Sequence, residues 1–182
     1  AARRSRPMID SHCHLAGTEF VEDLTAVVGR AVAAGLTEAL VILAADDDAE
    51  LDRAATVSAA WPAVRFSAGI HPHAAGAYSA APERTASIVA AAIDRLPGVR
   101  AVGEVGLDYH YDFAPREAQL AVFRHQIRLA RERRLPLVIH TREADDDTFT
   151  VLREEQAGTV GGVFHCFTGT RKDRKSTRLN SS

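Results

Sequence analysis

Cysteine is scarce in this chain of 182 residues, which contains only Cys13 and Cys166. Two cysteines, each next to a histidine, do not make the framework of a disulfide-stabilised secreted domain. We therefore expect both to be reduced thiols of a cytoplasmic protein, each a small buried side chain.

Long hydrophobic runs are also missing. No segment approaches the roughly 20 apolar residues of a membrane-spanning helix, and the basic start AARRSRP is not followed by the apolar stretch of a signal peptide. These absences predict a protein with no membrane partner. Met8 is a candidate initiator, which would make residues 1–7 an N-terminal extension.

Neither sign of charge dominates the chain, which has 22 Lys and Arg against 24 Asp and Glu and a net charge of −2. This balance argues against coating long nucleic acid by charge alone, but it leaves room for a site that grips a single phosphate. The sequence also has no Gly-rich phosphate loop and no G-x-S-x-G motif. Nothing therefore supports a serine or cysteine nucleophile.

Apolar segments with the pattern of buried strands alternate with segments of helical periodicity. The six strand-like segments are MIDSHCHL, EALVILAA, VRFSAGIHPH, VRAVGEVGLDY, LPLVIHT and GGVFHCF. Helices are expected between them at 19–34, 46–61, 82–96, 115–134 and 142–156. Strict alternation predicts parallel strands joined by crossover helices, and strands that are apolar throughout predict a sheet covered on both faces.

Ionisable residues gather where these strands end. Six of the eight histidines and two carboxylates follow the apolar strand cores: His12, His14, His71, His73, His140, His165, Glu104 and Asp108. Because the carboxyl ends of parallel strands share one face of the fold, these residues are expected to meet there. His110 and His125 lie elsewhere and are interpreted as surface or helix-packing residues, and the role of His73 stays open.

Imidazoles and carboxylates in one site suit zinc, manganese or cobalt better than magnesium or calcium, which prefer all-oxygen shells. His12 and His14, two residues apart on one strand, face the same way and can bind one ion. Asp10 lies one step deeper on that face and is expected to orient a ligand.

Glu104 has two carboxylate oxygens and can bridge this ion to a second one, which His140 and His165 can hold. A water shared by two metals loses a proton near neutral pH, and the metal surface stabilises charge on a phosphate or a carbonyl. Asp108, or a further carboxylate, is the candidate base.

Five motifs carry a family resemblance. IDSHCHL, GIHPH, GEVGLDY, PLVIHTREA and FHCFTGT occur in the order found in TatD-related metal-dependent hydrolases, which belong to the amidohydrolase-like barrel superfamily. Each motif alone is weak, but five in order at strand ends, from residue 8 to about residue 170, make the resemblance specific.

The resemblance implies a (β/α)8 barrel of the TIM type with two divalent ions (Zn, Mn, Mg or Co) and phosphodiesterase activity, often as a DNase on single strands or strand ends. By matching motifs, His12, His14 and Glu104 would hold one ion, and Glu104, His140 and His165 the other. His71 would lie beside the scissile phosphate. We add Arg142, two residues past His140 on the same face, as a candidate phosphate contact.

The sequence departs from the family pattern toward its C-terminus. Six strands are expected where the barrel has eight, and no residue matches the aspartate that the family places at a later strand end. We expect a C-terminally truncated barrel over 8–173, with 174–182 a non-native or disordered tail. Two alternatives stay open: a related barrel hydrolase that acts on an amide, ester or lactone, and an inactive truncated fragment.

Overall fold

The sheet is built from six strands that are parallel throughout. The computed structural model describes residues 7–165, and the strands follow one another across the sheet in chain order. Their bounds are β1 Met8–Cys13, β2 Leu36–Ala44, β3 Val64–Gly69, β4 Val99–Asp108, β5 Leu137–Arg142 and β6 Gly162–His165. Each neighbouring pair is parallel, which confirms the predicted sheet and its six strands.

A helix follows each of the first five strands. The α-helices are α1 Leu24–Ala33, α2 Asp48–Ala60, α3 Arg84–Arg95, α4 Arg116–Arg133 and α5 Asp145–Glu154. Short 3-10 helices lie at η1 Thr18–Phe20, η2 Pro72–Tyr78 and η3 Ala157–Thr159. The helix expected over 19–34 is therefore shorter than predicted, because the chain first makes a 3-10 turn before α1 begins.

Local signals fix where the helices start and end. Asp47 caps α2, its side chain accepting a hydrogen bond from the Glu50 backbone N–H at 2.9 Å. Gly35 follows α1 with a φ of +97°, in the left-handed region where glycine is favoured and where helices commonly stop. No helix among residues 7–165 is long and apolar enough to cross a membrane.

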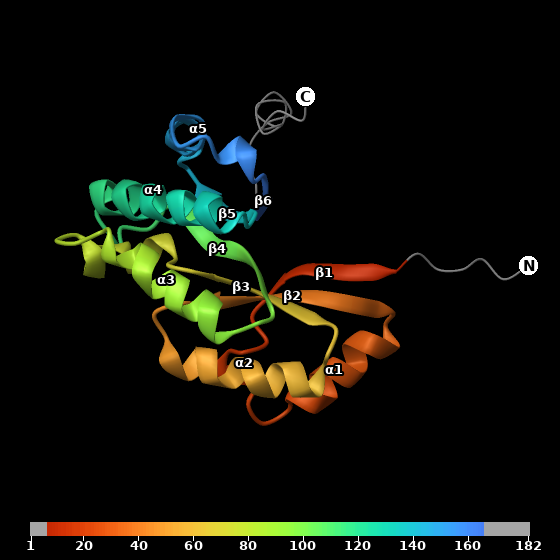
Figure 1. Ribbon diagram of the computed structural model, residues 1–182. Helices are drawn as coiled ribbons and strands as arrows, with labels where there is room; N and C mark the ends of the chain where they lie inside the picture. Colours follow the sequence, from red (N-terminus) through yellow and green to blue (C-terminus); the bar gives the residue numbers. More distant parts are fainter. Residues whose placement is uncertain (1–6, 166–182) are drawn as a thin grey trace, which may run out of the picture.

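The helices cover one side of the sheet, running in order from α1 and α2 to α5 (Figure 1). Val41 and Leu43 of β2 belong to the large core between sheet and helices. Ile42, which faces the other way, forms a second cluster with Ala101 and Val138 on the opposite face. That face is therefore the inner, concave face of a partial barrel.

The two edge strands do not fit the prediction that both faces of the sheet are covered by other parts of the chain. Met8 and Ile9 of β1 and Val163 of β6 are exposed. Each edge strand has a neighbour on one side only, so its apolar side chains have fewer atoms to pack against. Cys13 is half-buried on β1, and burial raises the pKa of its thiol to about 11. Cys166, residues 1–6 of the predicted extension and the predicted tail at 174–182 lie outside the described residues.

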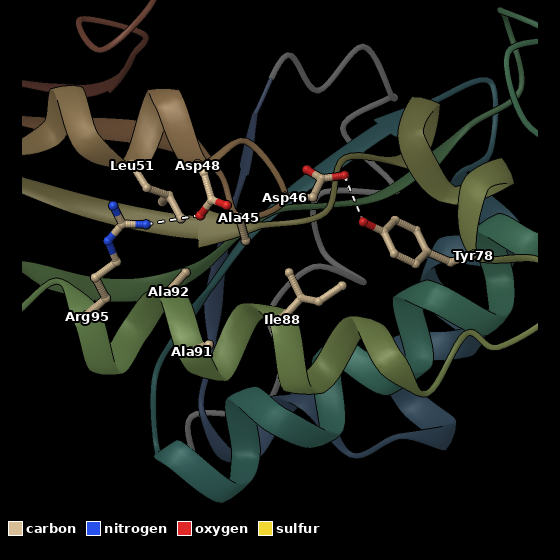
Figure 2. A pocket seen from close by; sticks show the side chains of 9 residues that line it. All are labelled: Ala45, Asp46, Asp48, Leu51, Tyr78, Ile88, Ala91, Ala92 and Arg95. Carbon is tan, nitrogen blue, oxygen red and sulfur yellow. Dashed lines mark hydrogen bonds and ion pairs between the residues drawn. The ribbon is translucent and has the colours of Figure 1, made fainter.

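A hollow of about 340 Å³ lies in the helical layer between α2 and α3 (Figure 2). Its polar groups pair with one another: the Tyr78 hydroxyl donates to Asp46 at 3.1 Å, and Arg95 pairs with Asp48 at 3.1 Å. These contacts tie the loop after β2 and the start of α2 to the segment that carries α3.

Candidate metal centre

Glu104 lies where three strands converge. The Nδ1 atom of His140, on β5, is 2.8 Å from Oε1 of Glu104, and the Nε2 atom of His12, on β1, is 3.4 Å from Oε2. Each carboxylate oxygen therefore faces an imidazole from a different strand. Glu104 itself is buried, so its charge depends on these partners.

The two edge strands meet at their carboxyl ends. The rings of His12 on β1 and His165 on β6 stack with centroids 3.4 Å apart, although these strands are not neighbours in the sheet. The sheet therefore curls until its first and last strands share the site. His14, expected on the strand, follows the end of β1 instead; it is exposed, and its Nε2 lies 3.2 Å from Nε2 of His12.

Asp108 joins one further histidine, His73, to the centre. Its Oδ2 lies 2.9 Å from Nε2 of His73 and 2.9 Å from Nε2 of His140. Its Oδ1 accepts the backbone N–H groups of His110 and Tyr111 at 3.0 and 3.1 Å. Both oxygens are thus engaged, and the buried carboxylate orients His140 from the side opposite Glu104.

The charges at the centre stabilise one another. Burial alone would raise the pKa of Glu104, but hydrogen bonds from His12 and His140 outweigh it and the pKa lies below the usual range. Burial likewise opposes ionisation of Asp108, yet bonds from His73, the Tyr111 backbone and His140 lower its pKa to about 2. The pKa of His140 is raised, because its two carboxylate partners outweigh burial. The centre therefore holds two carboxylates at neutral pH.

His71 lies at the same mouth and is held neutral. Burial lowers its pKa to about 4, and repulsion from His140 and His73 acts in the same direction. Its Nδ1 accepts the His73 backbone N–H at 3.2 Å, so the ring proton of the neutral form belongs on Nε2. The pKa of His165 is also lowered, by burial first and then by His12. Neutral imidazole is the form that binds metals.

Because the folded pKa of His71 is depressed, the unfolded chain binds more protons between about pH 6.5 and 4. In EDTA, we expect the free energy of unfolding to fall across this interval, by at most about 3 kcal/mol from this group. Urea titrations at pH 7, 5.5 and 4.5 measure the fall. His71→Asn should flatten the dependence while His125→Asn, on α4, should not; equal slopes in all three proteins would contradict the prediction.

The donor set fits a bound cation. Two groups of three ligand atoms lie within 4.8 Å of one another, His12–Glu104–His165 and His71–Glu104–His140. The buried Nδ1 of His12 has no hydrogen-bond partner among residues 7–165. Two imidazole Nε2 atoms 3.2 Å apart, as in His12 and His14, can share a proton or a cation but otherwise repel. Imidazole and carboxylate donors together suit a divalent transition metal.

The structure brings the predicted metal ligands together, but it groups them differently from the motif-based division. His165 lies with His12, and His71 joins Glu104 and His140. How the ligands divide between ions stays a prediction. Asp10 accepts the backbone N–H of His12 at 3.0 Å and so holds the main chain rather than the ring.

The other sequence predictions fall around this centre. Arg142 is exposed at the carboxyl end of β5, and its guanidinium lies 4.8 Å from the centroid of the Tyr111 ring. His110 pairs with Glu143 at 2.7 Å and is a surface residue, as expected. His125 is half-buried on α4, in agreement with a helix-packing role.

Sequence reasoning missed two glutamines that hold the strand ends. Gln126 accepts the Ile70 N–H at 2.7 Å and donates to the Ile70 carbonyl at 3.0 Å. Gln119 makes the same pair of bonds to Asp108, at 2.8 and 3.0 Å. Both are buried on α4, seven residues apart and so on one face. The sequence did contain a signal for them: two glutamines seven residues apart on the side of a helix whose other residues are apolar.

Replacing Gln126 with leucine is expected to lower the free energy of unfolding by about 3 kcal/mol, because it leaves a buried N–H and a buried C=O of Ile70 without partners. Urea denaturation measures the change. The matched control, His125→Leu at the neighbouring half-buried position, should cost less than about 1 kcal/mol. Equal effects of the two substitutions would show that the glutamine bonds contribute little.

Parallel strands that alternate with helices, with histidines and carboxylates gathered at the strand ends, define the class of protein: a partial barrel with a candidate metal site at the carboxyl ends of its strands. The sequence model of the "TatD related DNase" family matches residues 9–178, and the chain belongs to that family.

Among curated proteins, the chain is 37% identical over 174 residues to "Uncharacterized metal-dependent hydrolase YabD" of Bacillus subtilis (strain 168), covering 95% of this chain and 66% of that protein. It is 37% identical over 169 residues to "3'-5' ssDNA/RNA exonuclease TatD" of Rahnella sp. (strain Y9602), covering 91% and 61%. The chain thus spans slightly less than two thirds of these relatives.

Solved structures agree on the fold. The TatD homologue YJJV from Escherichia coli matches with a TM-score of 0.79 at 28% identity, covering 94% of this chain and 64% of that one. A TatD family hydrolase from Entamoeba histolytica matches with a TM-score of 0.80 at 22% identity, covering 94% and 62%. These likenesses confirm the predicted resemblance and the partial barrel.

Proposed function

We propose that this chain is a metal-dependent hydrolase of phosphodiester bonds, acting on single-stranded DNA or strand ends. The observation that carries the proposal is the position of Glu104, a buried carboxylate with an imidazole from β1 at one oxygen and one from β5 at the other. Such a carboxylate is suited to bridge two ions, and two-metal sites are common in enzymes that cleave phosphodiesters.

The proposed ligands of one ion are His12, His14 and Glu104, and those of the other are Glu104, His140 and His165. The described contacts support the five ligands as a set but not their division between the ions, since His12 and His140 lie within 3.4 Å of Glu104 while His14 and His165 both lie against His12. Divalent ions bound there would supply an activated water and stabilise negative charge on the phosphate.

His71 is proposed to donate a hydrogen bond to a phosphate oxygen. Its low pKa keeps the ring neutral, and the bond that Nδ1 accepts from the His73 backbone leaves the proton on Nε2. This donor is fixed before substrate binds, so little reorganisation is needed when charge develops.

Asp108 is proposed to orient His140 and His73, which its Oδ2 contacts at 2.9 Å each. The role of Asp108 as base stays a prediction, and it would require one of these contacts to open. Arg142, exposed at the carboxyl end of β5, is proposed to contact a phosphate other than the one whose bond is cleaved.

A related activity on an amide, ester or lactone is the second candidate, because bound ions can also polarise a carbonyl. Two observations favour the nucleic acid. The family is named for DNases, and the Rahnella relative is named a 3'-5' ssDNA/RNA exonuclease.

Parallel assays separate the candidates. Fluorescently labelled single-stranded DNA, p-nitrophenyl acetate and a lactone are incubated with the chain and Mn²⁺, Zn²⁺ or Mg²⁺. We expect metal-dependent shortening of the DNA that EDTA abolishes and added metal restores. Turnover of the ester or lactone alone would favour the second candidate, and metal binding without any turnover would identify an inactive fragment.

A further inference from the structure

An exposed pair of aromatic rings lies beside the metal centre, in the segment that joins β4 to α4. Tyr111 is 40% exposed and Phe113 is 63% exposed, and their rings stack at 18° with centroids 5.1 Å apart. We call Tyr111, Phe113 and the adjoining Arg142 the aromatic rim. Large aromatic side chains left this accessible beside a site are available to bind a flat ligand.

The aromatic rim is continuous with the candidate metal centre through His73. The His73 ring meets Phe113 edge-on, with centroids 4.8 Å apart, and Tyr111 at 5.6 Å. On its other side, Nε2 of His73 contacts Asp108, which also contacts His140. One side chain therefore separates the rings from the carboxylates of the centre, so a ligand bound at both places spans a short distance.

The rings of the rim suit a neutral, flat group, while Arg142 beside them can contact a neighbouring phosphate. Arg142 is the cation at the rim, and its guanidinium lies 4.8 Å from the centroid of Tyr111. Two exposed carboxylates adjoin the rim residues in the sequence: Asp112 lies between Tyr111 and Phe113, and Glu143 follows Arg142 and pairs with His110. A nucleobase presents a π-face that stacks on aromatic rings and on guanidinium planes.

We infer that the aromatic rim stacks the base of the nucleotide next to the scissile phosphate of a single strand. This inference rests on the proposed function and adds what the metal centre alone does not provide, a reason to prefer single strands. Bases in a duplex are already paired and stacked, so their faces are not free for Phe113. Because every base has a π-face, the rim is expected to tolerate all four bases.

The test uses the 182-residue chain and an oligothymidylate with 2-aminopurine at its 3′ or its 5′ end. Stacking quenches 2-aminopurine fluorescence, and stopped-flow mixing with Mn²⁺ present reads the quenching before turnover. We expect quenching with one of the two probes and a five- to hundredfold weaker affinity for Phe113→Ala. Phe113→Leu should lose the quenching although it keeps an apolar side chain, and Phe113→Trp should keep it. Val32→Ala, an exposed apolar position on α1, is the matched control.

A second measurement compares hydrolysis of a normal oligonucleotide with one that is abasic at the probed end. Phe113→Ala should lower kcat/KM for the normal strand, mainly through KM, and leave the abasic strand unchanged. If the unsubstituted chain quenches the probe and Phe113→Ala does not, but no DNA is hydrolysed, the proposed function is overturned while base stacking on the aromatic rim is supported. Hydrolysis that is insensitive to Phe113 substitutions, or absence of quenching by the unsubstituted chain, would overturn the inference.

Discussion

Replacing Glu104 with glutamine is expected to weaken binding of Mn²⁺ or Zn²⁺ at least a hundredfold and to lower hydrolysis of single-stranded DNA by a similar factor or more, on the order of what supporting groups of metal sites and charge-stabilising donors contribute. The amide has the shape of the carboxylate but no negative charge. It also removes the charged partner of both His12 and His140. Isothermal titration with each metal, together with a DNA shortening assay, measures the two effects.

Glu143→Gln is the control for this substitution. Glu143 is an exposed carboxylate at the same mouth, paired with His110 rather than with the clustered imidazoles. It should leave metal affinity within about twofold, because exposed ion pairs contribute little. A Glu104→Gln protein that binds metal as tightly as the control would show that this carboxylate is not a ligand.

Replacing Gly106 with alanine is expected to destabilise the fold by about 3 kcal/mol or more, lowering the Tm by about 6–12 °C or preventing folding. Gly106 has a φ of +144°, and an added Cβ would lie 2.0 Å from the backbone oxygen of His140. The clash is between a Cβ on β4 and the backbone of β5, so neither partner can rotate away. Thermal denaturation followed by circular dichroism measures the loss.

Gly29→Ala in α1 is the matched control for Gly106→Ala. A Cβ at position 29 would meet nothing within 4 Å, and alanine favours the helix by up to about 1 kcal/mol. The control should therefore be as stable as the parent or slightly more stable. If Gly106→Ala behaved like Gly29→Ala, β4 and β5 would not approach each other as closely as described.

Much of the centre could be predicted because strand ends are simple to locate in this chain. An apolar run that ends in a histidine or a carboxylate marks the place, and parallel topology brings such places to one face. Glu104 and His140 illustrate this, since they are 36 residues apart in sequence and 2.8 Å apart in space. His73 was left open because a residue in the turn after a strand, here the 3-10 helix η2, has no fixed periodicity.

The sequence by itself determined the alternation of strands and helices, the closeness of His12 and His14 at the end of β1, and the family, because these depend on local periodicity and on order along the chain. Only the tertiary structure decided that β1 and β6 meet, that Gln119 and Gln126 hold the ends of β4 and β3, and that aromatic rings border the centre. The reason is physical. These contacts depend on how far the sheet curls and how α4 is rotated, and both result from packing among the whole set of core side chains.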